Sequence, residues 1–420
     1  YIRHMQIEEH MLIEEHIQIE EHMQIEEHMQ IEGHIREFIN RHIADDINSL
    51  ALQRKRYCEL SDLDWQIVMQ QIEGRQRSAK KLPTLCQIND WIFPAKLSIE
   101  QCSSEQTAAY KRDLLLQYLP ERNTLADLTG GYGIDTWFLS DIFTTTHYVE
   151  RQSELAKIAE HNFAFSNNHI IVHNTDAHDF LSTAEHYDCI YIDPARRSKT
   201  GGKVFRLEDC EPDITAIYLT LLSKCDWLLL KLSPMLDITT ALRSLPETCL
   251  VCILAVDNEV KEMLVLINAN KRHEPLQYSA VNISAQRHVF NFKAEEERNA
   301  SCVYADAADT YIYEPNVAIM KVGAFKLIAE QYGISKLSKN THLYTSDRLI
   351  ADFQGRAWKV LAIADKKLIK GMSLNVLSRN YPLSAEQIRA KYHLRESDKD
   401  YLIATKIADN NCMLLAERIY

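Results

Sequence analysis

The sequence lacks several features that would place it in a particular class of protein. No uncharged apolar run reaches the roughly 18–20 residues that a membrane-spanning helix needs, and we find no signal-peptide pattern. Its ten cysteines are scattered, without the compact spacing of a disulfide framework. We therefore expect a reduced, cytoplasmic protein that has no membrane segment.

Residue groups that are typical of several enzyme classes are also missing. We find neither a nucleophile triad nor a metal cluster. Cys249 and Cys252 have a Cys-x-x-Cys spacing, but they lie in an apolar strand-like run, where an odd separation directs side chains to opposite faces. Since no second pair accompanies them, we expect both cysteines in the core and predict no metal site.

Charge is distributed unevenly along the 420 residues, a length that predicts two or three domains. The formal net charge is −12, of which residues 1–34 contribute −8 through nine glutamates and one arginine. Residues 319–420 hold 17 Lys and Arg against 10 Asp and Glu. This basic segment is a modest indication of a polyanionic partner, although a solvated basic face would have the same composition.

Residues 1–34 form a six-residue repeat, HMQIEE, with histidine at positions 4, 10, 16, 22, 28 and 34. In a helix, six residues advance by about 600°, so no continuous apolar stripe forms and successive imidazoles do not meet. In a strand they would be ~20 Å apart. We expect a poorly ordered appendage without a chemical role, and the alternative is a helix that contacts another protein.

The remaining chain has four regions. Residues 35–120 have apolar residues at helical spacing, notably over 35–57 and 62–72, and a capping-box start before a helix that ends near residue 118. Residues 121–270 alternate strand and helix, which predicts an α/β, doubly wound parallel sheet. Its predicted strands are 124–129, 145–150, 169–173, 187–193, 227–232, 249–256 and 263–267. The last two are too close in sequence for a crossover, so we expect them to pair antiparallel, as in a seven-stranded methyltransferase sheet.

The C-terminal part is expected to be α+β. Residues 271–318 are predicted as a small β-rich subdomain, for which a ferredoxin-like fold is one option. Residues 319–420 are predicted as a mixed unit, with one helix over about 315–332 that ends at Gly333 and another between Ser384 and His393.

A glycine-rich turn follows the first predicted strand, in the stretch DLTGGYG at 127–133. An acid at a strand end, then a glycine turn, then a helix N-terminus is how an α/β sheet holds a nucleotide-like cofactor. NAD is a competing ligand, but Thr136 occupies the position where its motif requires a third glycine. Further acids follow the next strands. The predicted cofactor-binding residues are Asp127, Thr129, Gly130, Gly131, Gly133, Asp135, Glu150, Asp176 and Asp193.

These acids would meet at the carboxyl edge of the sheet, where open α/β sheets bind ligands. Glu150 is placed to accept hydrogen bonds from ribose hydroxyls, Asp176 to contact adenine, and Asp193 lies where a transferred methyl group would project. Asp135 has a second interpretation as a helix N-cap. Four acids at four consecutive strand ends indicate S-adenosylmethionine more specifically than the glycine turn alone.

The chain resembles the class I S-adenosylmethionine-dependent methyltransferases. Over residues 35–420 it is similar to a bacterial group that joins this domain to a C-terminal THUMP-like domain. The stretches that carry the resemblance are SIEQCSSEQT (98–107), DLTGGYG (127–133), DPARR (193–197), YEPN (313–316) and LSRNYP (377–382). Because THUMP domains bind RNA, the resemblance implies RNA methylation. The arrangement of the first predicted strand, the fourth predicted strand and the basic loop that follows it also resembles the guanine-N2 methyltransferases of ribosomal RNA.

The stretch at 193–197 departs from the Asp/Asn-Pro-Pro-Tyr/Phe motif of many amine methyltransferases, in which the acid and the proline carbonyl accept the hydrogens of the amine and the aromatic ring stacks on the base. Here Asp193 and Pro194 are followed by Ala195 and Arg196. The acceptors are present, and Arg196 would either stack on a base or pair with phosphate. We predict Asp193, Pro194 and Arg196 as catalytic. The predicted substrate-binding residues are Arg196, Arg197, Lys199, Lys203, Arg206 and Arg379.

The sequence therefore predicts a methyltransferase that acts on RNA, on a base amine of structured ribosomal or transfer RNA. Uracil-C5 methylation is disfavoured because it needs a thiolate after the fifth strand, whereas Cys225 lies at the opposite end of that strand. Two alternatives remain: a methyltransferase that acts on a protein or small molecule, and a non-catalytic RNA-binding module.

Overall fold

The computed structural model describes residues 33–196, 206–270, 275–365 and 367–420, without the side chain of Arg196. The chain divides into two compact units, and the division falls after Leu230, within strand β7 (Cys225–Leu232). The repeat at 1–34 lies outside the described residues except for its last two positions, where helix α2 begins. In the described part of the chain, no helix is long and apolar enough to cross a membrane.

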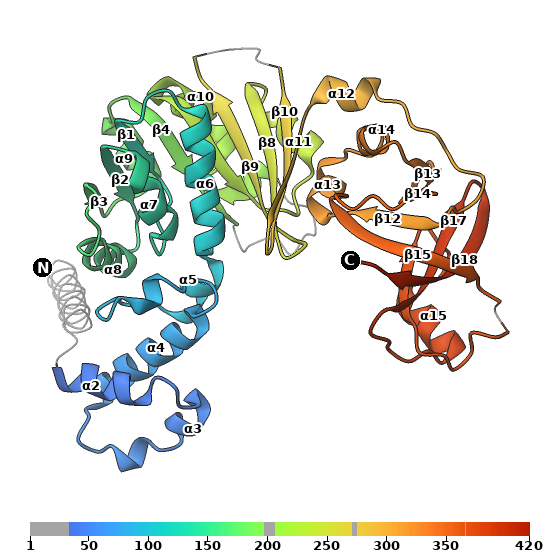
Figure 1. The fold of residues 1–420 in the computed structure, drawn as a ribbon. Coiled ribbons are helices and arrows are strands. Elements are labelled where there is room, and N and C mark those ends of the chain that lie inside the picture. The colour runs from blue at the N-terminus through green and yellow to red at the C-terminus, as the bar shows by residue number, and fades with distance from the viewer. Residues whose placement is uncertain (1–32, 197–205, 271–274, 366) are drawn as a thin grey trace, which may run out of the picture. The chain divides into compact units, whose positions relative to one another are not determined.

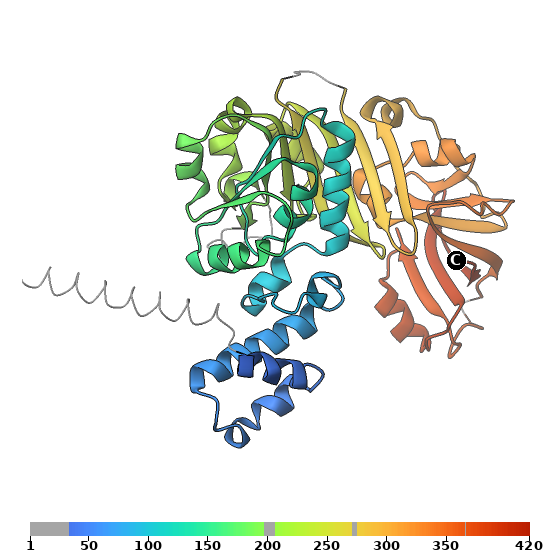
Figure 2. The same cartoon turned by 60° about the vertical axis from the view of Figure 1, so that its left-hand side comes forward.

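The first unit begins with helices that have a core of their own (blue in Figures 1 and 2). They are α2 (Gly33–His42), α3 (Ile47–Ala51) and α4 (Asp62–Ser78). Helices α5 (Lys96–Gln101) and α6 (Glu105–Tyr118) follow, and their residues Ile99 and Ala108 belong to a different core, which also contains Tyr132. The helical pattern at 35–57 is interrupted because Asp46 accepts a hydrogen bond from the backbone N of Ser49 and starts a new helix.

Five parallel strands follow in the first unit, in the spatial order β7-β4-β1-β2-β3. They are β1 (Thr124–Asp127), β2 (Thr145–Val149), β3 (Ile170–His173), β4 (Tyr187–Ile192) and β7. The helices that connect them are α7 (Ile134–Leu139), α8 (Ser153–Phe163), α9 (Ala177–Thr183) and α10 (Ile214–Lys224). The predicted alternation of strand and helix is confirmed, and it brings the strand-end acids to one edge.

The second unit contains the antiparallel pair that the sequence predicts, β8 (Thr248–Val256) and β9 (Glu259–Asn268). Two more strands extend it in the order β11-β10-β8-β9: β10 (Gln277–Ile283) runs parallel to β8, and β11 (Arg287–Lys293) antiparallel to β10. Residues 277–293, expected in a separate subdomain, are therefore joined to this sheet by backbone pairing. Helices α11 (Ile238–Ser244) and α12 (Ala294–Asn299) complete this part.

A second, seven-stranded sheet completes this unit (orange to red in Figure 1), in the order β13-β14-β12-β15-β18-β17-β16. Its strands are β12 (Tyr311–Pro315), β13 (Ser335–Ser338), β14 (Thr341–Ser346), β15 (Gly355–Ile363), β16 (Asn375–Arg379), β17 (Asp400–Ile407) and β18 (Asn410–Arg418).

Three helices accompany this sheet: α13 (Val317–Val322), α14 (Leu327–Tyr332) and α15 (Ala385–Tyr392). The single helix predicted over 315–332 is wrong. It is divided because Gly323 takes a left-handed conformation with φ of 86° and ends α13. Gly333 ends α14, as predicted.

Within the first unit, a segment before α5 is fastened to the sheet domain by hydrogen bonds to buried groups. The side chain of Asn162 in α8 accepts from the backbone N of Ile92 and donates to its carbonyl, both at 2.9 Å. Trp91 Nε1 donates to the hydroxyl of Tyr132, in the glycine-rich turn, at 2.6 Å. The N-terminal helices are thus tied to the same residues that support the turn.

We predict that Asn162→Leu lowers the free energy of unfolding by about 1–3 kcal/mol, because the buried amide of Ile92 loses its acceptor. Urea denaturation measures this change. Asn167→Ala, an exposed control on the same segment, should stay within about 0.5 kcal/mol of the parent chain. Equal stability of the Asn162 variant and the parent chain would show that this contact does not hold the two parts together.

Candidate functional site

The glycine-rich turn lies directly over the aromatic ring of Tyr148 in β2. A Cβ atom on Gly130 would lie 2.1 Å from that ring, and one on Gly133 would lie 2.7 Å from the ring of Phe163. Gly133 also has φ of 81° and is the N-cap of α7. Glycine is therefore required at both positions for the turn to approach the sheet this closely.

Gly131 differs from its neighbours because it faces open space. A Cβ atom there would have only the carbonyl oxygen of Thr129 nearby, at 3.8 Å, and its φ of 54° is left-handed. Its backbone N donates to Glu150 Oε2 at 2.9 Å, and its carbonyl accepts from the hydroxyl of Tyr148 at 2.5 Å. The turn thus leaves a backbone-lined space beside the carboxylate of Glu150.

Glu150 follows β2 and is buried, with its second oxygen accepting from the backbone N of Gln152 at 2.8 Å. Asn174 donates to the carbonyl of Glu150 at 2.8 Å. The predicted ribose-binding acid is thereby held in one position next to the glycine turn.

Asp127, at the end of β1, is almost completely buried. Its oxygens accept from the backbone N of Thr129 at 3.0 Å and from the hydroxyl of Thr136 at 2.6 Å. Burial raises the pKa of Asp127 to about 7, and these two hydrogen bonds offset part of the effect. Asp127 therefore keeps its proton to a much higher pH than an ordinary carboxyl does.

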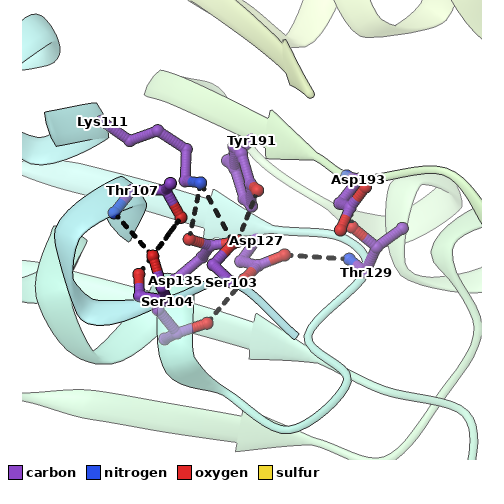
Figure 3. A network of polar contacts seen from close by, with 10 residues as sticks. Ser103, Ser104, Thr107, Lys111, Asp127, Thr129, Asp135, Tyr191 and Asp193 are labelled. Carbon is purple, nitrogen blue, oxygen red and sulfur yellow. Dashed lines mark hydrogen bonds and ion pairs between the residues drawn. The ribbon is translucent and has the colours of Figure 1, made fainter. Parts of the chain in front are cut away.

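Asp135 belongs to a buried polar network (Figure 3). Its carboxylate lies 3.1 Å from the ammonium of Lys111, a lysine with no exposed side-chain surface, and accepts from the hydroxyls of Ser103 and Tyr191, both at 2.7 Å. Lys111 also donates to the hydroxyl of Ser103 at 3.0 Å. Asp135 is not the N-cap of α7, because that position is Gly133. Its carboxylate instead joins α6, α7 and β4.

Sequence reasoning did not identify Lys111 or Tyr191 as part of the site. A lysine in a helix is normally exposed, and a tyrosine within a buried strand is normally core. The available signal was the stretch at 98–107, which contains Ser103 and carried part of the family resemblance. That stretch indicated that Ser103 belongs to a family motif, but it gave no physical reason for the network around Asp135.

Asp193 follows β4 and is linked to the glycine turn. Its backbone N donates to the hydroxyl of Thr129 at 2.6 Å, and the same threonine donates its backbone N to Asp127. Figure 3 shows Asp193 and Thr129 side by side. The structure therefore brings the predicted catalytic acid to the predicted cofactor turn. Pro194, the next predicted residue, is partly buried.

The chain after Pro194 forms a short two-stranded ladder. Strand β5 (Ala195–Arg196) pairs antiparallel with β6 (Cys210–Glu211). Three predicted substrate-binding residues, Arg197, Lys199 and Lys203, lie outside the described residues, as does the side chain of Arg196. Arg206 is exposed. The ladder pairs Ala195 with Glu211 and Arg196 with Cys210, directly after the Asp193 turn.

Two predicted residues have local partners elsewhere. Asp176 is exposed and accepts from the backbone N of His178 and of Asp179 as the N-cap of α9. With those two side chains it forms an exposed group whose ligand atoms are close enough for a metal ion. The cap uses Oδ1 of its carboxylate. Arg379 lies in the second unit, where it is paired with Glu314.

We predict that Asp127→Asn flattens the pH dependence of stability. The pKa in the folded chain is about 7 and the ordinary value is 3.8, so burying the neutral acid stabilises fully below about pH 4, and this contribution is lost as the pH rises towards 7. The parent chain should lose up to ~4 kcal/mol more than the variant between pH 4 and pH 8.

Urea denaturation across this pH range measures the difference, with Asp176→Asn as an exposed control. Parallel stability curves for the parent chain and Asp127→Asn would contradict the raised pKa.

We also predict that Lys111→Met lowers the free energy of unfolding by about 3–5 kcal/mol, because the buried carboxylate of Asp135 loses its counter-charge. The double change Lys111→Met with Asp135→Leu should cost less than the single one. Arg112→Met, a change on the same helix as Lys111, breaks partly exposed ion pairs to Asp113 and Asp141 and should cost about 1 kcal/mol or less. A double variant less stable than Lys111→Met would contradict the pairing.

Solved structures provide the comparison for this arrangement. The chain is similar to the crystal structure of a putative methyltransferase from Porphyromonas gingivalis W83, with 30% sequence identity and a TM-score of 0.80, over 92% of this chain and 98% of that one. A putative methyltransferase from Streptococcus mutans in complex with SAH matches 38% of this chain and 95% of its own, at 15% identity and a TM-score of 0.30. An rRNA methylase from Streptococcus thermophilus matches 40% of this chain and 98% of its own, at 12% identity and a TM-score of 0.28.

The family assignment depends on the first of these structures and on the C-terminal part of the chain. A family model described as a ferredoxin-like domain matches residues 311–353, whereas the ferredoxin-like option predicted from the sequence lies at residues 271–318. A family model described as THUMP domain-like matches residues 355–418. No curated protein matches the chain. The chain belongs to the same methyltransferase family as the Porphyromonas gingivalis structure and carries a C-terminal THUMP-like domain.

Proposed function

We propose that the chain transfers a methyl group from S-adenosylmethionine to a base amine of structured RNA, of ribosomal or transfer type. The observation that carries this proposal is the 2.6 Å hydrogen bond from the backbone of Asp193 to Thr129. It joins the turn that would hold the target amine to the turn that would hold the cofactor. Transfer of a methyl group needs these two positions to be adjacent.

The residues around the glycine turn fit S-adenosylmethionine. The open space at Gly131 would be filled by a side chain if the residue were not glycine, and it is therefore free for a ligand. Glu150 lies beside that space with a fixed carboxylate suited to ribose hydroxyls. Asp176 would contact adenine at the next strand end, and Asp127 and Asp135 support the turn from within the protein. The acids thus divide into ligand contacts and internal supports.

When bound, the cofactor supplies a methyl carbon that its sulfonium has already activated. The chain therefore needs no nucleophile, and alignment provides most of the rate. The carboxylate of Asp193 would accept a hydrogen bond from one N–H of the target amine and orient it, and the carbonyl of Pro194 would accept a hydrogen bond from the other. The amine releases one proton to the surrounding water when it receives the methyl group. Arg196 would either stack on the base or pair with a phosphate, and the basic residues from Arg197 to Arg206 would approach the RNA backbone.

RNA is favoured as the acceptor by the C-terminal part of the chain. Residues 355–418 match a THUMP-like domain, and THUMP domains in general bind RNA. Residues 319–420 carry 17 Lys and Arg against 10 Asp and Glu, which suits a polyanion. A protein or small-molecule acceptor is the main alternative, and loss of turnover in a surviving RNA-binding module is another, prompted by Arg196 in place of an aromatic residue.

We predict that Glu150→Gln weakens S-adenosylmethionine binding about tenfold or more, because a charged acceptor of the ribose hydroxyls is lost. Asp193→Ala should bind the cofactor as the parent chain does but should transfer no label to RNA. Isothermal calorimetry measures the first effect, and incubation with labelled cofactor and total RNA measures the second.

Glu154→Gln, an exposed change in the first turn of α8, serves as a control that should leave binding unaltered. Unchanged affinity in Glu150→Gln would remove that residue from the site, and turnover by Asp193→Ala would remove its proposed role. Labelling of protein instead of RNA would favour the main alternative. RNA and cofactor both bound without any transfer would favour the non-catalytic module.

A further inference from the structure

Two arginines share one buried carboxylate in the second unit. Glu314 in β12 is 6% exposed. Arg356 in β15 donates its Nε to Glu314 Oε2 at 3.1 Å and also donates its Nη2 to that oxygen, while Arg379 in β16 donates its Nε to Oε1 at 2.5 Å. One carboxylate neutralises only one of the two guanidinium charges. The cluster of Glu314, Arg356 and Arg379 therefore has a net charge of +1.

The arginines retain hydrogen-bond donors beyond those that Glu314 uses. A guanidinium has five N–H groups. Among the described residues, Arg356 uses Nε and Nη2 on Glu314, and Arg379 uses Nε on Glu314 and Nη1 on the carbonyl of Ser378 at 3.0 Å. Each side chain therefore has donors left over. The exposed fractions of these side chains are 30% for Arg356 and 44% for Arg379, so the donors are accessible to a ligand.

Buried polar groups beside the cluster also lack partners among the described residues. Trp358 Nε1 and Thr405 Oγ1 belong to fully buried side chains and make no hydrogen bond there. Trp358 lies two residues from Arg356 on the same face of β15, with the guanidinium carbon of Arg356 5.3 Å from its ring centroid, and Thr405 is paired in register with Arg379. Neither side chain has exposed surface, so a ligand outside the protein reaches the unused arginine donors and not these two groups.

A purely structural role explains only part of this arrangement. Glu314 lies in the segment that matches a ferredoxin-like domain, and both arginines lie in the segment that matches a THUMP-like domain, so the ion pairs join the two segments. One arginine would be enough to neutralise the buried acid. The second arginine, Arg379, is almost half-exposed and adds a positive charge that the acid does not need. The buried carboxylate of Glu314 holds this charge in a fixed position.

We propose that the Glu314–Arg356–Arg379 cluster binds a backbone phosphate of the RNA substrate. This inference rests on the proposed function, and it assigns part of RNA binding to three residues. The planar guanidinium fork matches the oxygens of a phosphate, and the shared carboxylate holds both forks in place before the ligand arrives. Arg379, predicted from the sequence to contact substrate, thus acquires a defined role and two partners.

The test uses the full chain and fluorescein-labelled bulk transfer RNA, with anisotropy titrations at several salt concentrations. Arg379→Ala should bind about tenfold more weakly than the parent chain, and the slope of log affinity against log salt should fall by about one, as expected for one lost phosphate contact. Lys391→Ala removes the same charge from an exposed position on α15 and should change affinity less than about twofold.

The fold is checked by thermal unfolding of each variant. If Arg379→Ala does not fold, Arg379→Lys replaces it: the charge next to Glu314 remains but the fork is lost, so RNA affinity should fall several-fold while the salt slope stays the same. Wild-type affinity in a folded Arg379→Ala or Arg379→Lys variant would overturn the proposal. If Lys391→Ala weakened RNA binding as much as Arg379→Ala, the proposal would also be overturned, because the positive charge of the surface as a whole would then explain RNA binding.

Failure of the inference is distinguishable from failure of the proposed function. If the parent chain binds transfer RNA but Arg379 does not contribute, only the phosphate site is rejected. If the parent chain binds neither transfer RNA nor total ribosomal RNA at any salt concentration, the RNA acceptor and the phosphate site are both rejected. Calorimetry with S-adenosylmethionine still tests the methyltransferase assignment separately.

Discussion

The buried ion pair between Lys111 and Asp135 determines how the parts of the candidate site are placed relative to one another. An unpaired lysine with no exposed surface would be very costly, so α6 must meet the carboxylate in the first turn of α7. Tyr191 donates to the same carboxylate from β4, two residues before Asp193. The helix after the glycine turn and the strand that precedes Asp193, the proposed catalytic acid, are thus fixed by the carboxylate of Asp135 and its partners.

The glycine turn depends on this arrangement and on close packing beneath it. Gly130 and Gly133 allow the backbone to lie against Tyr148 and Phe163, so the turn cannot shift toward the sheet. Thr129 donates its backbone N to Asp127 and accepts with its hydroxyl from Asp193. Room for a ligand therefore lies on the side of the turn where Gly131 faces open space. A turn held by these contacts suits a reaction whose rate comes mainly from alignment.

The sequence was sufficient for the architecture and for the side chains at strand ends, because strand and helix periods and glycine turns are local signals. It did not reveal that Asp135 faces inward to Lys111, since that contact joins residues 24 positions apart on separate helices. The joining of 277–293 to β8 likewise depends on tertiary pairing. The division of the 315–332 helix at Gly323 differs, because a glycine that ends a helix is a local signal, which the helical pattern masked. The pairing of Arg379 with Glu314, 65 residues away, has no local signal at all.

The central claim is that a single pocket, formed by the glycine turn, Glu150 and the Asp193 turn, holds the cofactor. A crystal structure of the full chain with S-adenosylhomocysteine, the demethylated product, tests it most directly. Our account predicts the ribose hydroxyls on the carboxylate of Glu150, the ligand backbone beside Gly131, and the sulfur facing Asp193. A ligand bound elsewhere, or a pocket that the side chains fill in the complex, would contradict it.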